Sequence, residues 1–163
     1  MDLFNQLNEL NDRALPAYKL PKIKVSFARE ENKVAKKFSS SREAASIARA
    51  YLKELGTLQM QESFLIMPTD SKLKPLGIIE VSRGSINATL VDIRIVLGLC
   101  LVCNAVGFIA FHNHPSGNLS ASTEDKNLTK NLDKASKIMD IKLVDHIIVT
   151  EAGHTSFKDE GLF

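Results

Sequence analysis

The segment from His112 to Asp125, with the sequence HNHPSGNLSASTED, holds the residues of this chain best suited to chemistry. Its two histidines lie one residue apart, at and just after the end of the apolar run VGFIAFH, which predicts a buried strand. Side chains at positions i and i+2 of a strand point the same way, so His112 and His114 are expected to present their imidazoles to one point in space. This spacing predicts half of a metal site.

The residues after the histidines supply a third ligand. Pro115 and Gly117 predict a turn, and Ser122 and Asp125 then open a segment with apolar residues at helical spacing. These apolar residues are Leu128, Leu132, Ala135, Ile138 and Met139. Asp125 is therefore expected in the first helical turn, where it can point back at the histidines. Two imidazoles and one carboxylate leave a coordination position open for water, as in catalytic zinc sites.

Simpler interpretations exist for each piece taken alone. Ser122 and Asp125 have the spacing of a capping box, in which a serine and an acidic residue satisfy free helix amides. The tetrapeptide HNHP at a strand end is also compatible with a polar turn that binds nothing. The conjunction of both motifs, between a buried strand and an amphipathic helix, favours the metal site.

At these residues the chain resembles the JAMM (MPN) metallohydrolases, whose signature is His-x-His-x7-Ser-x2-Asp with a glutamate upstream. His112, His114, Ser122 and Asp125 meet it without a gap. The wording HNHPSG, followed by DHIIV and by SFKDEGLF at the C-terminus, is more narrowly similar to the RadC branch, from about Ser40 to Phe163. The resemblance implies an α/β MPN fold, a mixed sheet flanked by helices in a cytidine-deaminase-like sandwich, together with a zinc ion and hydrolase chemistry.

The implied chemistry assigns roles to further residues. Zinc held by the two histidines and Asp125 would lower the pKa of a bound water to about 7. A separate carboxylate must take the proton, and the family pattern matches Glu62 better than Glu80, whose apolar neighbours predict that it turns outward. Ser122 is a candidate donor to the developing oxyanion, an interaction of ~3 kcal/mol.

Asp145 and His146 remain open between two roles. Either side chain could hydrogen-bond a zinc ligand from behind. A satisfied pair in the core or at the sheet edge fits the sequence equally well.

The remaining elements predict a single α/β domain. Ser40 and Glu43 fit a capping box before a helix that stops at Gly56. Strands are expected over 62–67, 76–81 and 142–149, and an apolar helix over about 89–104. Together these elements predict a sandwich with at least one deeply buried helix. We expect an N-terminal extension over 1–39 and the MPN domain over 40–163.

Composition sets the class of protein. The chain has 163 residues, 44% hydrophobic and 25% charged, with a net charge of +2, which is ordinary for a globular domain. No apolar run is long enough for a membrane span and the N-terminus does not resemble a signal peptide, so a cytoplasmic location without membrane association is expected. Cys100 and Cys103 lie in an almost wholly apolar segment, which favours packing over metal or redox work.

Two functions remain in contention. The first is a zinc hydrolase that cuts peptide or isopeptide bonds of an unknown substrate. The alternative is a DNA-repair-associated protein, for which the segment from Lys19 to Lys37, with seven basic and two acidic residues, is the only basic patch. It fits either a solvated linker or a weak DNA-binding surface. RadC proteins usually carry an N-terminal helix-hairpin-helix region, and nothing before Ser40 resembles one, which favours the hydrolase.

Overall fold

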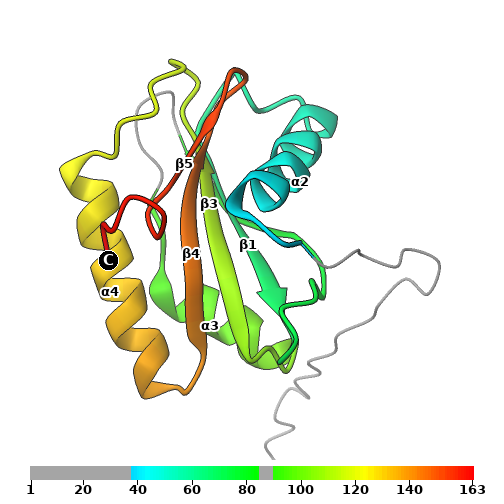
Figure 1. Cartoon of the computed structure of the whole chain (residues 1–163), viewed down its shortest axis with the longest axis vertical. Coiled ribbons are helices and arrows are strands. Elements are labelled where there is room, and N and C mark those ends of the chain that lie inside the picture. Colours follow the sequence, from blue (N-terminus) through cyan, green and yellow to red (C-terminus); the bar gives the residue numbers. More distant parts are fainter. Residues whose placement is uncertain (1–37, 85–89) are drawn as a thin grey trace, which may run out of the picture.

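The computed structural model describes residues 38–84 and 90–163, which form a five-stranded mixed sheet with helices on both sides (Figure 1). The strand order is β2-β1-β3-β4-β5. The strands are β1 (Ser63–Thr69), β2 (Ile79–Arg83), β3 (Gly107–Asn113), β4 (Lys142–Val149) and β5 (His154–Ser156). Strands β3 and β4 pair in parallel, and the other three pairs are antiparallel. The predicted α/β fold with a mixed sheet flanked by helices is confirmed.

The two faces of the sheet are covered by different helices. Helix α2 (Ser41–Glu54) packs on one face, and α3 (Ile93–Val102) and α4 (Thr123–Ile138) pack on the other (Figure 1). Because strand side chains alternate, Leu65 and Phe111 belong to the core under α2, whereas Phe64 and Ala110 belong to the core under α3 and α4. We call these the α2 face and the α3–α4 face.

The predicted capping box of α2 is half correct. The Ser40 hydroxyl accepts a hydrogen bond from the Glu43 amide at 3.2 Å, as expected for an N-cap. The Glu43 carboxylate, however, accepts from the Ser39 amide at 2.7 Å and not from that of Ser40. The acidic side chain thus satisfies the amide one residue earlier in the chain.

The apolar helix before β3 differs from the prediction. It is shorter than 89–104, because Asp92 caps its start by accepting from the Arg94 amide and Asn104 leaves the helix with φ 51°. It is also not deeply buried, since Ile95 and Leu101 are 50% and 49% exposed. Apart from Arg94, helix α3 is apolar around its circumference, but only one side of it faces the sheet. The prediction of a deeply buried helix is therefore wrong for α3.

The remaining predictions concern the first two strands, the cysteines, membrane helices and the N-terminal segment. Strands β1 and β2 pair as expected, although β1 begins at Ser63 and β2 at Ile79, later than predicted. Cys100 and Cys103 are free and buried, and burial raises the pKa of the Cys100 thiol to about 12, which confirms their packing role. The described residues contain no helix able to cross a membrane. The basic segment 19–37 and the extension expected over 1–39 fall outside the described residues, except for the last two of the extension.

Candidate metal centre

Strand β3 fixes the first histidine because it lies in the middle of the sheet. His112 pairs with Phe64 of β1 on one side and with Ile148 of β4 on the other. Its side chain lies on the α3–α4 face, and the residue is only 6% exposed. His114 follows the last residue of the strand, where its amide donates to the Val149 carbonyl at 3.2 Å. Both imidazoles therefore start from rigid backbone and share one face of the sheet.

A tight turn redirects the chain from β3 toward α4. The Gly117 amide donates to the His114 carbonyl at 3.0 Å, and Gly117 has φ 80°, a conformation that favours glycine. The next carbonyl, that of Asn118, lies 2.7 Å from His114 Nδ1. Since a carbonyl can only accept, the ring proton of His114 is on Nδ1 and a neutral ring leaves Nε2 with a lone pair.

Asp125 is held in the first turn of α4 by a complete capping box. The Ser122 hydroxyl accepts from the Asp125 amide at 3.0 Å, and Asp125 Oδ2 accepts from the Ser122 amide at 2.8 Å. The capping interpretation of this pair is thus confirmed. It does not compete with a ligand role, because the other carboxylate oxygen, Oδ1, lies 3.1 Å from His112 Nε2.

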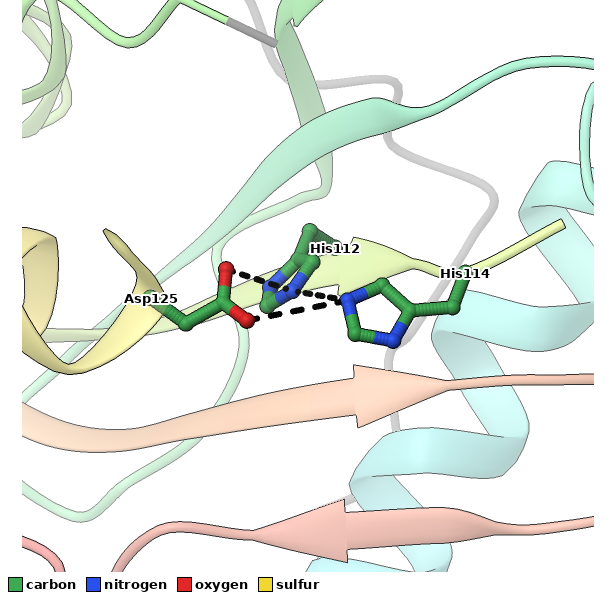
Figure 2. A group of neighbouring side chains, drawn as sticks. All are labelled: His112, His114 and Asp125. Carbon is green, nitrogen blue, oxygen red and sulfur yellow. Dashed lines mark hydrogen bonds and ion pairs between the residues drawn. The ribbon is translucent and has the colours of Figure 1, made fainter. Parts of the chain in front are cut away.

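The three side chains converge on one point (Figure 2). The Nε2 atoms of His112 and His114 are 2.9 Å apart, and His114 Nε2 lies 3.7 Å from Asp125 Oδ2. Ligands of a tetrahedral zinc ion at bond lengths near 2.1 Å are about 3.4 Å apart. The separations of 2.9 Å between the two Nε2 atoms and 3.1 Å between His112 Nε2 and Asp125 Oδ1 are slightly below that value, and one ligand atom from each residue lies within 4.8 Å of the others. The spacing of the donor atoms fits a metal ion.

The charge of the site also fits a cation. Burial raises the pKa of Asp125, but its contacts with His112 and Ser122 outweigh this effect and hold the pKa well below its usual range. Asp125 is therefore ionised. Two imidazole nitrogens and one carboxylate oxygen match the ligands that zinc uses in catalytic sites.

Glu62 lies immediately before β1, next to this cluster. It is two residues from Phe64, the cross-strand partner of His112, so its side chain shares the α3–α4 face with the histidines. Burial raises the pKa of Glu62, the charges of His112 and His114 lower it, and that of Asp125 raises it. The carboxyl is half-buried and within electrostatic reach of all three predicted ligands.

Glu80, the alternative base, faces away from the site. It pairs across the strands with Leu65, which belongs to the α2 face. Its carboxylate accepts two hydrogen bonds from the Arg83 guanidinium, at 2.8 and 2.7 Å, which lower its pKa. Glu80 thus lies on the opposite face of the sheet from the predicted ligands, and its side chain is partly buried and not fully turned to solvent.

The structure separates the two candidates Asp145 and His146. His146 Nε2 lies 2.9 Å from His112 Nδ1, behind the metal-facing side of that ring. Asp145 points to the α2 face, where it accepts from the Ser156 hydroxyl at 2.6 Å and from the Lys158 amide at 3.1 Å. His146 thus contacts a predicted ligand, whereas Asp145 is satisfied within the core.

Two residues of this region were not identified from the sequence. Thr129 Oγ1 lies 2.6 Å from His146 Nδ1, and a lone threonine in an amphipathic helix gives no signal for such a contact. Asn113, between the two histidines, points to the opposite face and is fully buried. Its side chain accepts from the Ser63 amide at 2.8 Å and donates to the Leu58 and Gln61 carbonyls at 2.8 and 3.0 Å. A signal for Asn113 existed, since a polar residue alternating with two ligands must face the core.

Comparison with known proteins agrees with this geometry. The chain is 40% identical over 128 residues to a UPF0758 protein of Flavobacterium johnsoniae, covering 78% of this chain and 54% of the relative. It is 38% identical over 119 residues to a UPF0758 protein of Pseudomonas fluorescens, covering 73% of this chain and 53% of the relative. The chain spans about half the length of these curated relatives. The RadC-like JAB domain family matches residues 38–162, and the chain belongs to this family.

Proposed function

We propose that this domain is a zinc-dependent hydrolase that cleaves an amide bond, either peptide or isopeptide. The observation that carries the proposal is the convergence of His112, His114 and Asp125 beside a half-buried glutamate with a raised pKa. JAB domains are generally hydrolytic, which supports the same class of reaction. A bound zinc ion would supply Lewis-acid chemistry that activates water and polarises a carbonyl.

The residues of the chain divide the work as follows. His112, His114 and Asp125 hold the metal. Glu62 accepts the proton of the attacking water and returns it to the leaving nitrogen. Its raised pKa suits this exchange, because a carboxyl that binds a proton more readily than usual is a better base at the moment of attack.

Ser122 has a second task beside capping α4. Its hydroxyl accepts from the Asp125 amide, which leaves the hydroxyl proton for another acceptor. The residue is exposed and lies at the start of the helix whose first turn carries Asp125. We propose that it donates to the oxyanion that develops as the carbonyl is attacked.

The surroundings of the site suit a chain-like substrate. Residues 116–118 and 122–124, which frame the predicted ligands, are exposed. An extended peptide or an isopeptide branch could reach the site from solvent without any part of the described chain moving. The substrate class is therefore proposed as polypeptide.

The test compares Glu62 with Glu80 in the zinc-loaded 163-residue chain. A defined mixture of peptides, with one pair joined through a lysine side chain, is incubated with each variant and cleavage is followed by mass spectrometry. Glu62→Gln should lower hydrolysis by ~10² to 10⁴ without loss of zinc, the usual contribution of positioned proton transfer. Glu80→Gln is the matched control and should hydrolyse like the parent protein.

Two results would contradict the proposal. One is a parent 163-residue chain that retains no zinc after equimolar loading and dialysis. The other is a Glu62→Gln variant that hydrolyses at the parent rate.

Association with DNA should be weak and steeply salt-dependent, given the net charge of +2. Submicromolar DNA binding that survives ~200 mM salt would instead favour the DNA-associated function.

A further inference from the structure

A chain of buried hydrogen bonds runs away from the metal-facing side of His112. His112 Nδ1 lies 2.9 Å from His146 Nε2, and His146 Nδ1 lies 2.6 Å from Thr129 Oγ1. Thr129 Oγ1 in turn lies 2.6 Å from the Asp125 carbonyl. His146 and Thr129 have no exposed surface, so water cannot stand in for either partner.

The last acceptor in this series of hydrogen bonds decides which atom is the donor in each of them. The Asp125 carbonyl can only accept, so the single hydroxyl proton of Thr129 goes to it. Thr129 Oγ1 must then accept from His146, which places the His146 ring proton on Nδ1. His146 Nε2 is left as an acceptor, so His112 donates from Nδ1. A neutral His112 ring then carries a lone pair and no proton on Nε2, the atom that faces His114 and Asp125.

We propose that Thr129 and His146 are positioning residues that select the metal-binding tautomer of His112. The inference rests on the proposed metal site and extends it to two residues that contact no substrate. In the opposite tautomer, a proton on Nε2 would be donated toward Asp125 Oδ1, 3.1 Å away, and would block coordination. We call the hydrogen bonds from the Asp125 carbonyl through Thr129 and His146 to His112 the relay. The relay removes the competing tautomer.

Two features make a two-step relay necessary. An imidazole behind His112 does not by itself decide the tautomer, because either of its nitrogens can carry the proton. The His146 ring is also held in place, stacked on Phe157 with centroids 4.7 Å apart and edge-on to Phe64 at 5.7 Å. A ring that cannot turn needs a fixed partner at its far nitrogen, and Thr129 is that partner.

The relay also joins two ligands of the site. It starts at the ring of His112 on β3 and ends at the main chain of Asp125 on α4. The helix turn that carries the carboxylate is thus tied to the strand that carries the imidazole. Loss of the Thr129 hydroxyl should disturb both the tautomer of His112 and the position of the first turn of α4 relative to β3.

The first experiment reads the tautomer directly in the full chain without metal. Long-range 1H–15N NMR of the imidazoles, above the pH range in which an ordinary histidine titrates, distinguishes a protonated from a bare nitrogen. We expect both His112 and His146 to carry the proton on Nδ1. A proton on His112 Nε2 in the parent protein would overturn the proposal. This measurement needs no variant to fold.

The second experiment measures zinc affinity by competition with a chromophoric chelator. Thr129→Val keeps the volume and removes the hydroxyl, and should weaken zinc binding by about 10- to 100-fold, as expected for loss of an outer hydrogen bond to a ligand. Thr129→Ser keeps the hydroxyl and should bind within about threefold of the parent. Ser136→Ala is the matched control, because Ser136 is a fully buried hydroxyl of the same helix that donates to the Asp133 carbonyl. It should leave zinc affinity unchanged.

The outcomes separate this inference from the proposed function. Zinc binding by Thr129→Val at the parent affinity, or by Thr129→Ser as weakly as by Thr129→Val, would overturn the relay and leave the metal site intact. A parent protein that binds no zinc would overturn the metal site. The NMR result would still show whether the relay sets the tautomer.

Discussion

Asp125 and Asp145 are both shielded carboxyls beside the central strands, yet the chain treats them in opposite ways. Asp145 accepts three hydrogen bonds from its own surroundings, from the Ser156 hydroxyl and from the His146 and Lys158 amides, at 2.6, 2.7 and 3.1 Å. Asp125 accepts from the Ser122 amide and turns its other oxygen toward the imidazoles. The fold supplies hydrogen-bond donors to the Asp145 carboxylate. The free oxygen of Asp125 instead faces imidazole nitrogens, and a metal ion would be its partner.

This difference gives a criterion for telling a structural acid from a ligand. A buried polar group without its partners destabilises the folded state, so a carboxylate with every oxygen engaged belongs to the core. A carboxylate whose free oxygen faces other hydrogen-bond acceptors indicates a site for a cation. Substitutions at Asp125, Asp145, Asn113 and Glu62 test that distinction.

The largest effect is expected at Asp125 itself. Asp125→Asn removes the anionic ligand while an amide oxygen can still cap α4. Zinc affinity should fall by about 1,000-fold, beyond the 10- to 100-fold typical of outer contacts, while the unfolding of the metal-free protein changes by no more than about 1 kcal/mol. Chelator competition and urea denaturation give the two values. Zinc binding within tenfold of the parent would remove Asp125 from the site.

Asp145→Ala should show the opposite pattern. Three donors that now point at the carboxylate would lose their acceptor, which should lower the free energy of unfolding by about 3 kcal/mol. Urea denaturation of the metal-free protein measures this loss. Below its unfolding transition the variant should still bind zinc within about threefold of the parent. A loss of zinc affinity as large as that of Asp125→Asn would show that the criterion fails.

Asn113 tests a residue between the ligands that serves the fold. Asn113→Ala should reduce unfolding free energy by about 2 kcal/mol, because the Ser63 amide and the Leu58 and Gln61 carbonyls lose their partner. The same bonds hold the segment that carries Glu62. Hydrolysis should therefore fall more than zinc affinity does, which kinetics and chelator competition can compare on one preparation. Unchanged hydrolysis in a folded variant would show that Asn113 does not position Glu62.

The smallest effect concerns the charge of Glu62. Its folded pKa lies above the ordinary value of 4.5, so its contribution to stability is present below the unfolded pKa and is lost as pH rises through the folded pKa. Glu62→Gln should make metal-free protein slightly more stable than the parent at neutral pH. The difference should disappear near pH 4, in about the range where the carboxyl protonates. Denaturation curves at the two pH values check this, and a destabilised variant at neutral pH would contradict it.

The sequence predicts His112, His114 and Asp125 as neighbours because strand and helix periods act over short distances. The structure does bring them together. Thr129 could not be found in this way. Helical spacing assigned Ile138 and Met139 to the buried face of α4, but they are 84% and 43% exposed.

The face of α4 that is buried includes Thr129 and Ser136. A hydroxyl can replace an apolar side chain in a core when it finds a hydrogen-bond partner, and that partner lies on β4, far along the chain. Strand β5 was missed for a related reason. Its three residues, His154–Ser156, are too few to show alternation and are defined by pairing with β4.

The position of His112 in a central strand has a consequence for hydrogen exchange. Strand β3 is paired with β1 on one side and β4 on the other, so its amides should exchange only when the whole domain unfolds, with or without zinc. The turn from Pro115 to Ala121 has no such ladder and is expected to open locally. Metal binding should therefore slow exchange most in this turn and in the first turn of α4. The strand thus holds His112 in place without metal, whereas the turn before α4 is expected to become more protected when metal binds.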